Sequence, residues 1–341
     1  MNTMEFKMKK ILLIVVVLGL SVNLFPQTKV GTTIANFLTI PVGPRASAMG
    51  GAFSAVANDA TTAFWNPAGL SRISRSEFTA STAEWLVSSR INWVGIGFKL
   101  DDDNAIGISI NQLDYGDEEI TTAQQQNGTG QFWSASDIAI NISYSRNLTD
   151  RFSVGGTLKY ISQNIYDVSA TGFGVDVGLL FFTQLEGLRL GMNISNFGTE
   201  MQLDGKSLLQ PIDIDPSNAG NNSNISGQLL TEAWSLPLTF TVGLAYDAYK
   251  DEDWLLTLAG DALIPNNQTT YGNLGMEITW GNLISLRGGY NSLFKEDAVE
   301  GLTAGIGLQY NFGGFFAKFD YSYAEYGIFD PISRFAVSVG L

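Results

Sequence analysis

From about residue 76 to the C-terminus, apolar and polar residues alternate with a period of two. In one segment Ile140, Ile142 and Tyr144 stand on one side of the chain, and Asn141 and Ser143 stand on the other. This period is typical of strands with one face of each kind. It predicts about fourteen strands, at 76–85, 91–100, 104–115, 133–147, 152–163, 171–183, 187–196, 238–249, 253–264, 270–280, 283–291, 300–311, 315–326 and 332–341. Several have roughly the nine to eleven residues that a tilted membrane strand requires.

The connections between these strands alternate between tight turns and longer polar loops. Turns are expected at 101–104, 147–150, 184–187, 250–253, 281–282 and 313–314, and the longest loops at 116–132 and 197–237. Outer-membrane barrels are built in this way, with short periplasmic turns and longer external loops. We therefore expect the turns and both ends of the chain on the periplasmic side, and the long loops outside.

The two faces of the expected strands differ in chemistry. One face is almost wholly apolar, and the other collects Lys159, Asp176, Arg189, Asp247, Asp261, Glu277, Arg287, Lys318, Asp320 and Arg334. Charges at membrane depth are tolerated where they face a lumen and find partners, so Lys318 and Asp320 are expected to form a lumenal ion pair. Interface girdles are expected from Trp93, Trp254, Tyr246, Tyr310, Phe312 and Tyr323.

These patterns predict an all-β fold, a transmembrane antiparallel β-barrel of about fourteen strands. Hydrocarbon offers no hydrogen bonds to an edge strand, so the sheet must close. A soluble or secreted β-sandwich is the open alternative, because it shares the period of two.

The segment 31–75 does not follow the alternation and is expected to be a hatch inside the barrel. It is rich in small residues, Asp59 precedes a short helix that it can cap, and Pro67 ends that helix. A lumen enclosed by about fourteen strands is too wide for side chains alone to fill, and this segment can block it. We therefore divide the chain into a signal peptide (1–26), a hatch (27–75) and a barrel (76–341).

The N-terminus has the pattern of an export signal. Lys7, Lys9 and Lys10 are followed by an apolar run from Ile11 to Leu20, which is shorter than the roughly 20 residues of a spanning helix. A short N-terminal membrane anchor is the alternative.

Composition excludes several classes of function. The chain has no His and no Cys, so His-dependent nucleophile systems, two-His zinc sites and disulfides are unavailable. Its net charge of −14 argues against a nucleic-acid partner. We predict no catalytic residues, no cofactor and no metal, and we interpret Asp101 to Asp103 as a solvated turn.

The hatch also carries a recognisable motif. The stretch GPRASAMGGAFSAVANDA from Gly43, running into FWNPAGL at Phe64 to Leu70, resembles the N-terminal signature of the PorV/PorQ family, which is similar in turn to the FadL long-chain fatty-acid channels. The resemblance implies an outer-membrane barrel, with Asn66, Pro67, Ala68 and Gly69 as the hatch motif. It also implies an association with type IX secretion, in which PorV-like barrels dock on the translocon and bind the C-terminal domains of secreted cargo.

Two functions follow as hypotheses. In the first, the chain is a binding adaptor for protein export, and its partner loop includes Pro211, Ile212, Asp213, Ile214, Leu229 and Leu230. In the second, it is a FadL-like channel for a hydrophobic ligand. A slip of the alternation at Ile110, Asn111, Gln112 and Leu113 would then kink the wall and open it. The cargo, the ligand and a PorV-like or PorQ-like role are left open.

Overall fold

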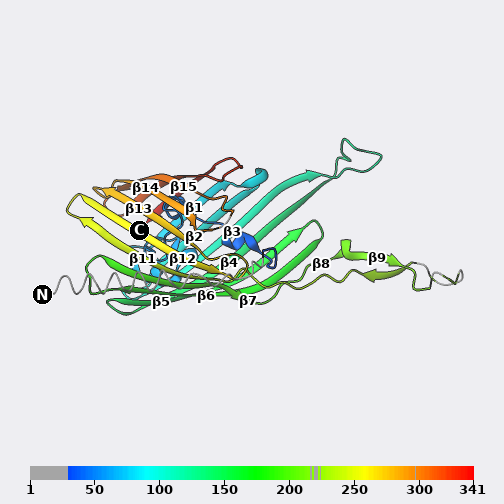
Figure 1. Ribbon diagram of the computed structural model, residues 1–341, viewed down its shortest axis with the longest axis horizontal. Coiled ribbons are helices and arrows are strands. Elements are labelled where there is room, and N and C mark those ends of the chain that lie inside the picture. Colours follow the sequence, from blue (N-terminus) through cyan, green and yellow to red (C-terminus); the bar gives the residue numbers. More distant parts are fainter. Residues whose placement is uncertain (1–29, 216, 219–221, 223, 296) are drawn as a thin grey trace.

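The computed structural model describes residues 30–215, 217–218, 222, 224–295 and 297–341. Within these residues, fourteen strands form a closed antiparallel barrel (Figure 1). The strands are β1 (Glu77–Glu84), β2 (Arg90–Lys99), β3 (Asn104–Glu119), β4 (Phe132–Thr149), β5 (Phe152–Ile165), β6 (Val168–Phe182), β7 (Leu188–Gly198), β11 (Thr239–Lys250), β12 (Trp254–Pro265), β13 (Tyr271–Trp280), β14 (Ile284–Leu293), β15 (Leu302–Asn311), β16 (Phe316–Ala324) and β17 (Ile332–Gly340). Pairing of β1 with β17 closes the barrel. The predicted export signal lies outside the described residues.

The barrel has an apolar exterior and a polar interior, the reverse of a soluble protein. On β4, Ile140, Ile142 and Tyr144 are exposed while Asn141 and Ser143 are buried. The alternation in the sequence is therefore the alternation between the outer face and the lumen. Lipid is the environment that makes this arrangement favourable, because lipid solvates the outer face and hydrogen bonds within the lumen satisfy the polar side chains.

One end of the barrel carries the tight turns and the other carries the loops. The tight turns connect β2 to β3, β4 to β5, β6 to β7, β11 to β12, β13 to β14 and β15 to β16. Leu341 lies at the same end, where its N–H donates to the Ser76 carbonyl (2.8 Å). We call this end the turn end and the opposite one the loop end.

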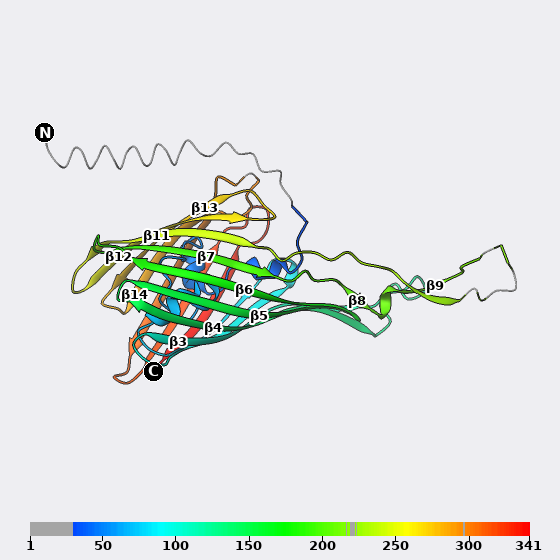
Figure 2. The ribbon, with the colours of Figure 1, turned by 90° about the horizontal axis from the view of Figure 1, so that it is seen from below.

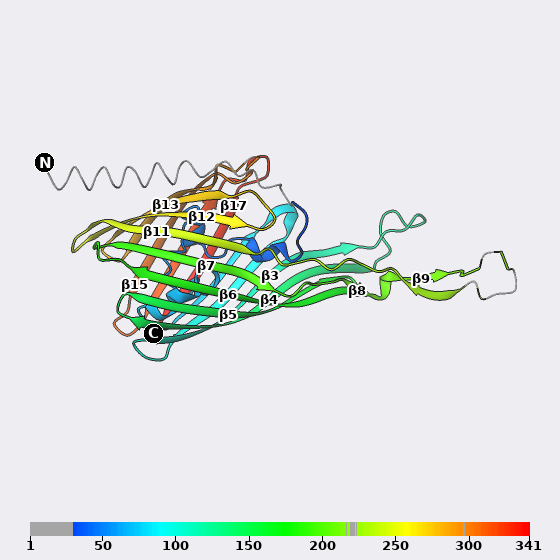
Figure 3. The same ribbon diagram turned by 60° about the horizontal axis from the view of Figure 1, so that its bottom comes forward.

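At the loop end, two connections reach far beyond the barrel (Figures 2 and 3). The first continues β3 and β4 into the loop 120–131. The second, residues 199–238, contains the short strand β8 (Asp204–Gly205), the turn η4 (Lys206–Leu208) and the hairpin of β9 (Leu209–Ile212) and β10 (Ile225–Gln228). We call residues 199–238 the arm. β8 pairs with the first two residues of β6. β9 pairs with β10 alone, so the hairpin stands away from the wall.

The hatch lies inside the barrel and crosses its lumen. It consists of η1 (Asn36–Thr39), α2 (Pro44–Ala48), α3 (Thr62–Trp65) and η2 (Pro67–Arg72), and a further turn, η3 (Leu86–Ser88), connects β1 to β2. Phe37 and Leu38 pack with wall residues near the loop end. At the other extreme, Arg72 donates to the carbonyls of Thr149 (3.0 Å) and Asp150 (2.9 Å) at the turn end.

The described chain therefore begins at the loop end. The Ile34 N–H donates to the Ser235 carbonyl of the arm (3.1 Å), and Asn267 donates to the Thr33 hydroxyl (2.7 Å). Residues 33 and 34 thus lie at the loop end, and the hatch makes one passage through the lumen before β1 starts. The first 29 residues lie outside the described part of the chain, so the expected side of the N-terminus stays a prediction.

Candidate functional site

The hatch motif lies against the wall between β5 and β6. Asn66 is fully buried, and its Nδ2 donates to the carbonyls of Ser54 (2.7 Å) and Leu179 (3.0 Å). Its Oδ1 accepts from the Ala68 N–H (3.1 Å), which caps the turn that Pro67 begins. Because proline has no N–H, it suits this first position, and the asparagine satisfies the next donor. Asn66 thus links two separate parts of the hatch to each other, and it also links the hatch to β6.

Glycines on the inner face of the wall allow this close approach. A Cβ atom at Gly155 would lie 2.4 Å from the carbonyl carbon of Pro67, and one at Gly178 would lie 2.1 Å from Asn66 Oδ1. On the opposite wall, a Cβ at Gly275 would lie 2.3 Å from the Met49 carbonyl oxygen. Contacts of this length exclude any side chain. The hatch is therefore in direct contact with the backbone of several strands.

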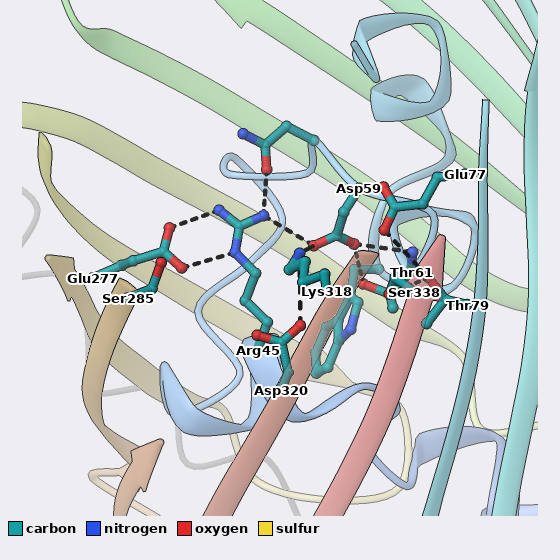
Figure 4. Close-up of polar contacts among 12 residues, drawn as sticks. Arg45, Asp59, Thr61, Glu77, Thr79, Glu277, Ser285, Lys318, Asp320 and Ser338 are labelled. Carbon is teal, nitrogen blue, oxygen red and sulfur yellow. Dashed lines mark hydrogen bonds and ion pairs between the residues drawn. The ribbon is translucent and has the colours of Figure 1, made fainter. Parts of the chain in front are cut away.

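A ring of ion pairs fastens the hatch to the wall, and Figure 4 shows the part of it formed by Arg45, Asp59, Glu277, Lys318 and Asp320. Arg45, from α2, binds both oxygens of Glu277 on β13, with Nε to Oε2 at 2.8 Å and Nη2 to Oε1 at 2.7 Å. Arg45 Nη1 also contacts Asp59 Oδ2 at 2.9 Å and Asn58 Oδ1 at 2.7 Å. Two parallel bonds to one carboxylate make this a strong and directional pair.

The ring continues along the wall and returns to the hatch. Glu277 also accepts from Arg287 on β14 (2.5 Å), and Arg287 donates to Asp320 on β16 (2.6 Å). Lys318 lies 3.7 Å from Asp320 and 4.0 Å from Asp59, and so closes the ring. The predicted lumenal pair of Lys318 and Asp320 is therefore present.

The ring's electrostatics depend on all of its members. Burial alone would raise the pKa of Asp59, but Lys318 and Arg45 outweigh burial and hold the pKa of this carboxyl below its usual value. Burial would likewise lower the pKa of Arg45, and Glu277 and Asp59 raise it instead. A buried charge that loses its partner costs about 3–5 kcal/mol. Removal of one member therefore leaves its neighbours in the ring as buried charges with fewer opposite charges.

The hatch separates two cavities. The loop-side cavity has a volume of about 140 Å³ and lies between Trp65 of the hatch and the wall strands β7 and β11–β13. The turn-side cavity, of about 350 Å³, is lined by the ion-pair ring together with Arg75 and Glu77. Hatch residues therefore line both cavities, with Phe64 and Trp65 at the loop-side cavity and Arg45 and Asp59 at the turn-side cavity.

The predicted partner residues all lie in the arm, outside the barrel. Pro211 and Ile212 are on β9, Asp213 and Ile214 follow it, and Leu229 and Leu230 follow β10. Ile214 is 73% exposed and Leu230 is 92% exposed. The structure brings these residues together in one projecting segment, far from the hatch motif.

The predicted wall kink is not at the predicted residues. Ile110, Asn111, Gln112 and Leu113 pair without interruption with β2 and with β4. Ile110 faces outward and Leu113 faces the lumen, so the alternation continues, and the apolar residue at 113 joins a lumenal cluster. The irregularity of β3 lies between Asp114 and Asp117, beyond its pairing with β2.

Some features of the site could not be predicted from the sequence. Trp93, expected in an interface girdle, is 1% exposed and faces the lumen, whereas Trp254 and Tyr310 are exposed on the outer face. Arg45 was part of the recognised motif, but its partner Glu277 lies 232 residues further along the chain. The alternation of apolar and polar residues predicts that Glu277 faces the lumen, but it does not identify the partner of Glu277.

Within the described part of the chain, no group of three or more acidic side chains is arranged to hold a metal ion. None of the helices described is both long and apolar enough to cross a membrane.

The fold and the plugged lumen define an outer-membrane β-barrel of FadL-like architecture. The chain is similar to CymD, a monoaromatic hydrocarbon channel, with 14% identity and a TM-score of 0.56 over 87% of this chain and 96% of that one. It is similar to the Ralstonia pickettii toluene transporter TbuX (13%, TM-score 0.54, 87% and 97%) and to a Pseudomonas aeruginosa FadL homologue (13%, 0.52, 92% and 99%). At these identities the likeness concerns the fold.

The chain belongs to the PorV family. The profile described as "Type IX secretion system protein PorV" matches residues 25–216, which include the hatch and the first seven strands. No curated protein sequence matches the chain. Family and fold together place the protein in the outer membrane, in agreement with the sequence-based expectation.

Proposed function

We propose that this protein is a non-enzymatic docking barrel of type IX protein secretion, which binds the translocon and the C-terminal domains of secreted cargo through its arm. In this proposal the loop end faces outward and the turn end faces the periplasm. Membership of the PorV family supports the association with secretion. The arm is the observation that carries the proposal.

The arm has the character of a binding segment. Ile214, Leu229 and Leu230 are exposed and belong to the arm, which projects beyond the loop end of the barrel (Figure 3). A two-stranded hairpin is marginally stable by itself in water, and a connection of this length is uncommon unless it is functional or disordered. A partner that covers these side chains would account for both properties.

The attachment of the hatch also favours docking over conduction. Close contacts at Gly155, Gly178 and Gly275, together with the ion-pair ring, hold the hatch against the wall. A docking protein needs a rigid scaffold and no passage, whereas a channel would need either these contacts to break or the wall to open.

The test shortens the arm. Residues 206–230 are replaced by a short Gly-Ser linker, and the protein is purified in mild detergent from native outer membranes, with its companions identified by mass spectrometry. Loss of a large barrel partner, or of secreted proteins that share a C-terminal domain, is expected. The matched control replaces residues 121–130 of the neighbouring loop. Unchanged companions after shortening of the arm would overturn the assignment to the arm.

A FadL-like channel for hydrophobic small molecules is the second candidate, and the fold of CymD and TbuX favours it. It requires the hatch to move, or the wall to open, during transport. Lipid or hydrocarbon density within the lumen, or uptake of toluene by liposomes that contain the barrel, would favour this function over docking.

A further inference from the structure

A groove in the outer wall of the barrel has features that the docking function does not use. It lies over β11, β12 and β13, which are neighbours in the wall, and it has a volume of about 600 Å³. Most of its lining is apolar and comes from Leu185, Leu188, Leu244, Tyr246, Leu258 and Leu274. We call it the outer groove. It opens on the lipid-facing side of the wall and is separate from both lumenal cavities.

The floor of the outer groove is Gly260 of β12. In the sheet, Gly260 pairs with Leu244 of β11 on one side and with Leu274 of β13 on the other. Both leucines are exposed on the outer face. A Cβ at Gly260 would lie 3.1 Å from Leu274 Cδ2 and 3.7 Å from the nearest backbone atom. The missing side chain therefore leaves a hollow between two apolar side chains.

The turn between β6 and β7 borders the other extreme of the groove. The Asp247 N–H donates to the Gly187 carbonyl (3.0 Å), so this turn rests against β11. Leu185 and Glu186 are both exposed there, and both line the groove. Within the described part of the chain, no hydrogen bond or ion pair engages the Glu186 carboxylate. The groove thus has one free charge, at its border nearest the turn end.

Exposed tryptophans show how deep the groove lies in the membrane. Trp254 and Trp280 pair at the turn end of β12 and β13, with ring centres 6.2 Å apart, and both are exposed on the outer face. Such residues mark the membrane interface. Gly260 lies further along β12 toward the loop end. The outer groove therefore begins near the interface, beside Glu186, and ends in the hydrocarbon region.

A lipid acyl chain is the occupant that this environment supplies. The groove volume of about 600 Å³ is about four times the roughly 150 Å³ that holds one six-carbon ring, so by that scale it has room for about two dozen carbon atoms. One acyl chain fits, and the two chains of a whole phospholipid do not. Within a bilayer, van der Waals packing replaces the hydrophobic effect as the attraction, and the hollow at Gly260 provides that packing.

Charge selects the headgroup. Glu186 lies at the interfacial border of the groove, and the turn between β11 and β12 carries Asp251, Glu252 and Asp253 against one cation, Lys250. The guanidinium of Arg189 does not offset this charge, because Asp247 binds it (2.7 Å). An acidic border attracts an ammonium group and repels a headgroup whose only charge is negative.

We propose that the outer groove binds one acyl chain of a phospholipid whose headgroup carries a primary ammonium, as phosphatidylethanolamine does. The ammonium lies toward Glu186, and the chain extends over Gly260 to Leu274. Because the tight turns of outer-membrane barrels face the periplasm, the lipid belongs to the inner leaflet. This proposal does not depend on the docking function.

The experiment uses the whole barrel in mild detergent. The barrel is mixed with equal amounts of phosphatidylethanolamine and phosphatidylglycerol that have the same acyl chains, and native mass spectrometry counts the lipids that stay bound. One phosphatidylethanolamine per barrel is expected to remain at collision energies that remove all other lipid. Equal retention of the two lipids, or loss of all lipid at the same energy, would overturn the proposal.

One pair of variants tests the groove. Gly260→Leu fills its floor and is expected to abolish the retained lipid. Gly156→Leu is the matched control, because Gly156 is an outer-face glycine of β5 that does not line the groove, and an added Cβ meets only the Asp176 carbonyl oxygen, at 3.5 Å. The shift of a folded barrel on an unheated gel shows that both variants fold. Equal lipid retention by the two variants would contradict the proposed site.

A second pair tests the charge, and it decides the question if Gly260→Leu does not fold. Glu186→Gln leaves the groove intact and is expected to lower the preference for phosphatidylethanolamine over phosphatidylglycerol about two- to fivefold, the usual effect of one exposed ion pair. Asp102→Asn, in the turn between β2 and β3 at the same end of the barrel, is the control and should keep the native preference. An unchanged preference in Glu186→Gln would overturn the proposed headgroup.

Discussion

Arg45 of the hatch and Glu277 of β13 form a bidentate ion pair, with N–O distances of 2.8 and 2.7 Å. This pair joins two parts of the chain that no local pattern connects, and it belongs to a ring in which each charge has at least one opposite neighbour. The hatch is therefore a fixed part of the barrel, held by specific partners.

Removal of Arg45 should release the hatch. Arg45→Met leaves Glu277 and Asp59 with fewer cations in a buried setting, and such a loss typically costs about 3–5 kcal/mol. Urea unfolding and limited proteolysis of the hatch measure the effect. Arg75→Met is the control, because Arg75 is exposed and its one hydrogen bond among the described residues is to the Gly314 carbonyl (3.2 Å); it should change stability by less than about 0.5 kcal/mol. Equal effects of the two substitutions would contradict the role of the ring.

The glycine contacts give a prediction about backbone distance. Gly155→Ala places a Cβ 2.4 Å from the carbonyl carbon of Pro67, so the hatch or β5 must shift. A loss of about 1–3 kcal/mol is expected, as for other overpacked sites. Gly314→Ala, where an added Cβ meets nothing within 4 Å, is the control. Thermal unfolding in detergent compares the two, and a Gly155→Ala barrel as stable as Gly314→Ala would show that the close approach is absent.

The hatch motif makes a separate prediction. Asn66→Ala leaves the Ser54 and Leu179 carbonyls without their donor and removes the cap of η2. Each unsatisfied buried group costs about 1–3 kcal/mol. Asn311→Ala, at the exposed end of β15, should have little effect. Cleavage of the hatch by an added protease reports its release, and a fully protected hatch in Asn66→Ala would contradict the assigned role.

The pKa of Asp59 predicts how the hatch responds to acid. Because the folded pKa lies below the ordinary value, the contribution of Asp59 to stability is present above the unfolded pKa of about 3.9. It is lost as the pH falls through the folded pKa. Hatch protection should therefore be constant from pH 8 to pH 5 as far as Asp59 is concerned, and should fall only in stronger acid. The measurement is protease protection between pH 7 and pH 3, and Asp59→Asn should be less protected already at pH 7. Loss of protection in the native protein near pH 6 would contradict this.

The strands were the most predictable part of the molecule. Each lipid-facing residue alternates with a lumenal one, so the period of two gave strand positions close to those observed, for example 104–115 against Asn104–Glu119 for β3. The extension of β3 lies past its pairing with β2 and pairs with β4 alone, and its residues no longer alternate, so the pattern ends before the strand does. The expectation that Trp93 belongs to an interface girdle was wrong, because an aromatic residue suits both a membrane interface and a packed lumen.

Long-range contacts were beyond prediction from one sequence. The motif identified the hatch, but alternation reports only the face on which a residue lies. It could not show that Arg45 meets Glu277, that Gly178 makes room for Asn66, or that the chain enters the lumen at the loop end. Each of these follows from the closure of the barrel, which brings distant strands around one segment.

The most direct test of the docking function is site-specific photo-crosslinking in living cells. A photoreactive amino acid is placed at Leu230, an exposed residue of the arm, and for comparison at Leu308, which faces outward on β15. The docking account predicts crosslinks from Leu230 to a large barrel protein or to secreted proteins that share a C-terminal domain, and none of these from Leu308. A Leu230 variant that is assembled in the outer membrane yet crosslinks to none of these proteins would contradict it.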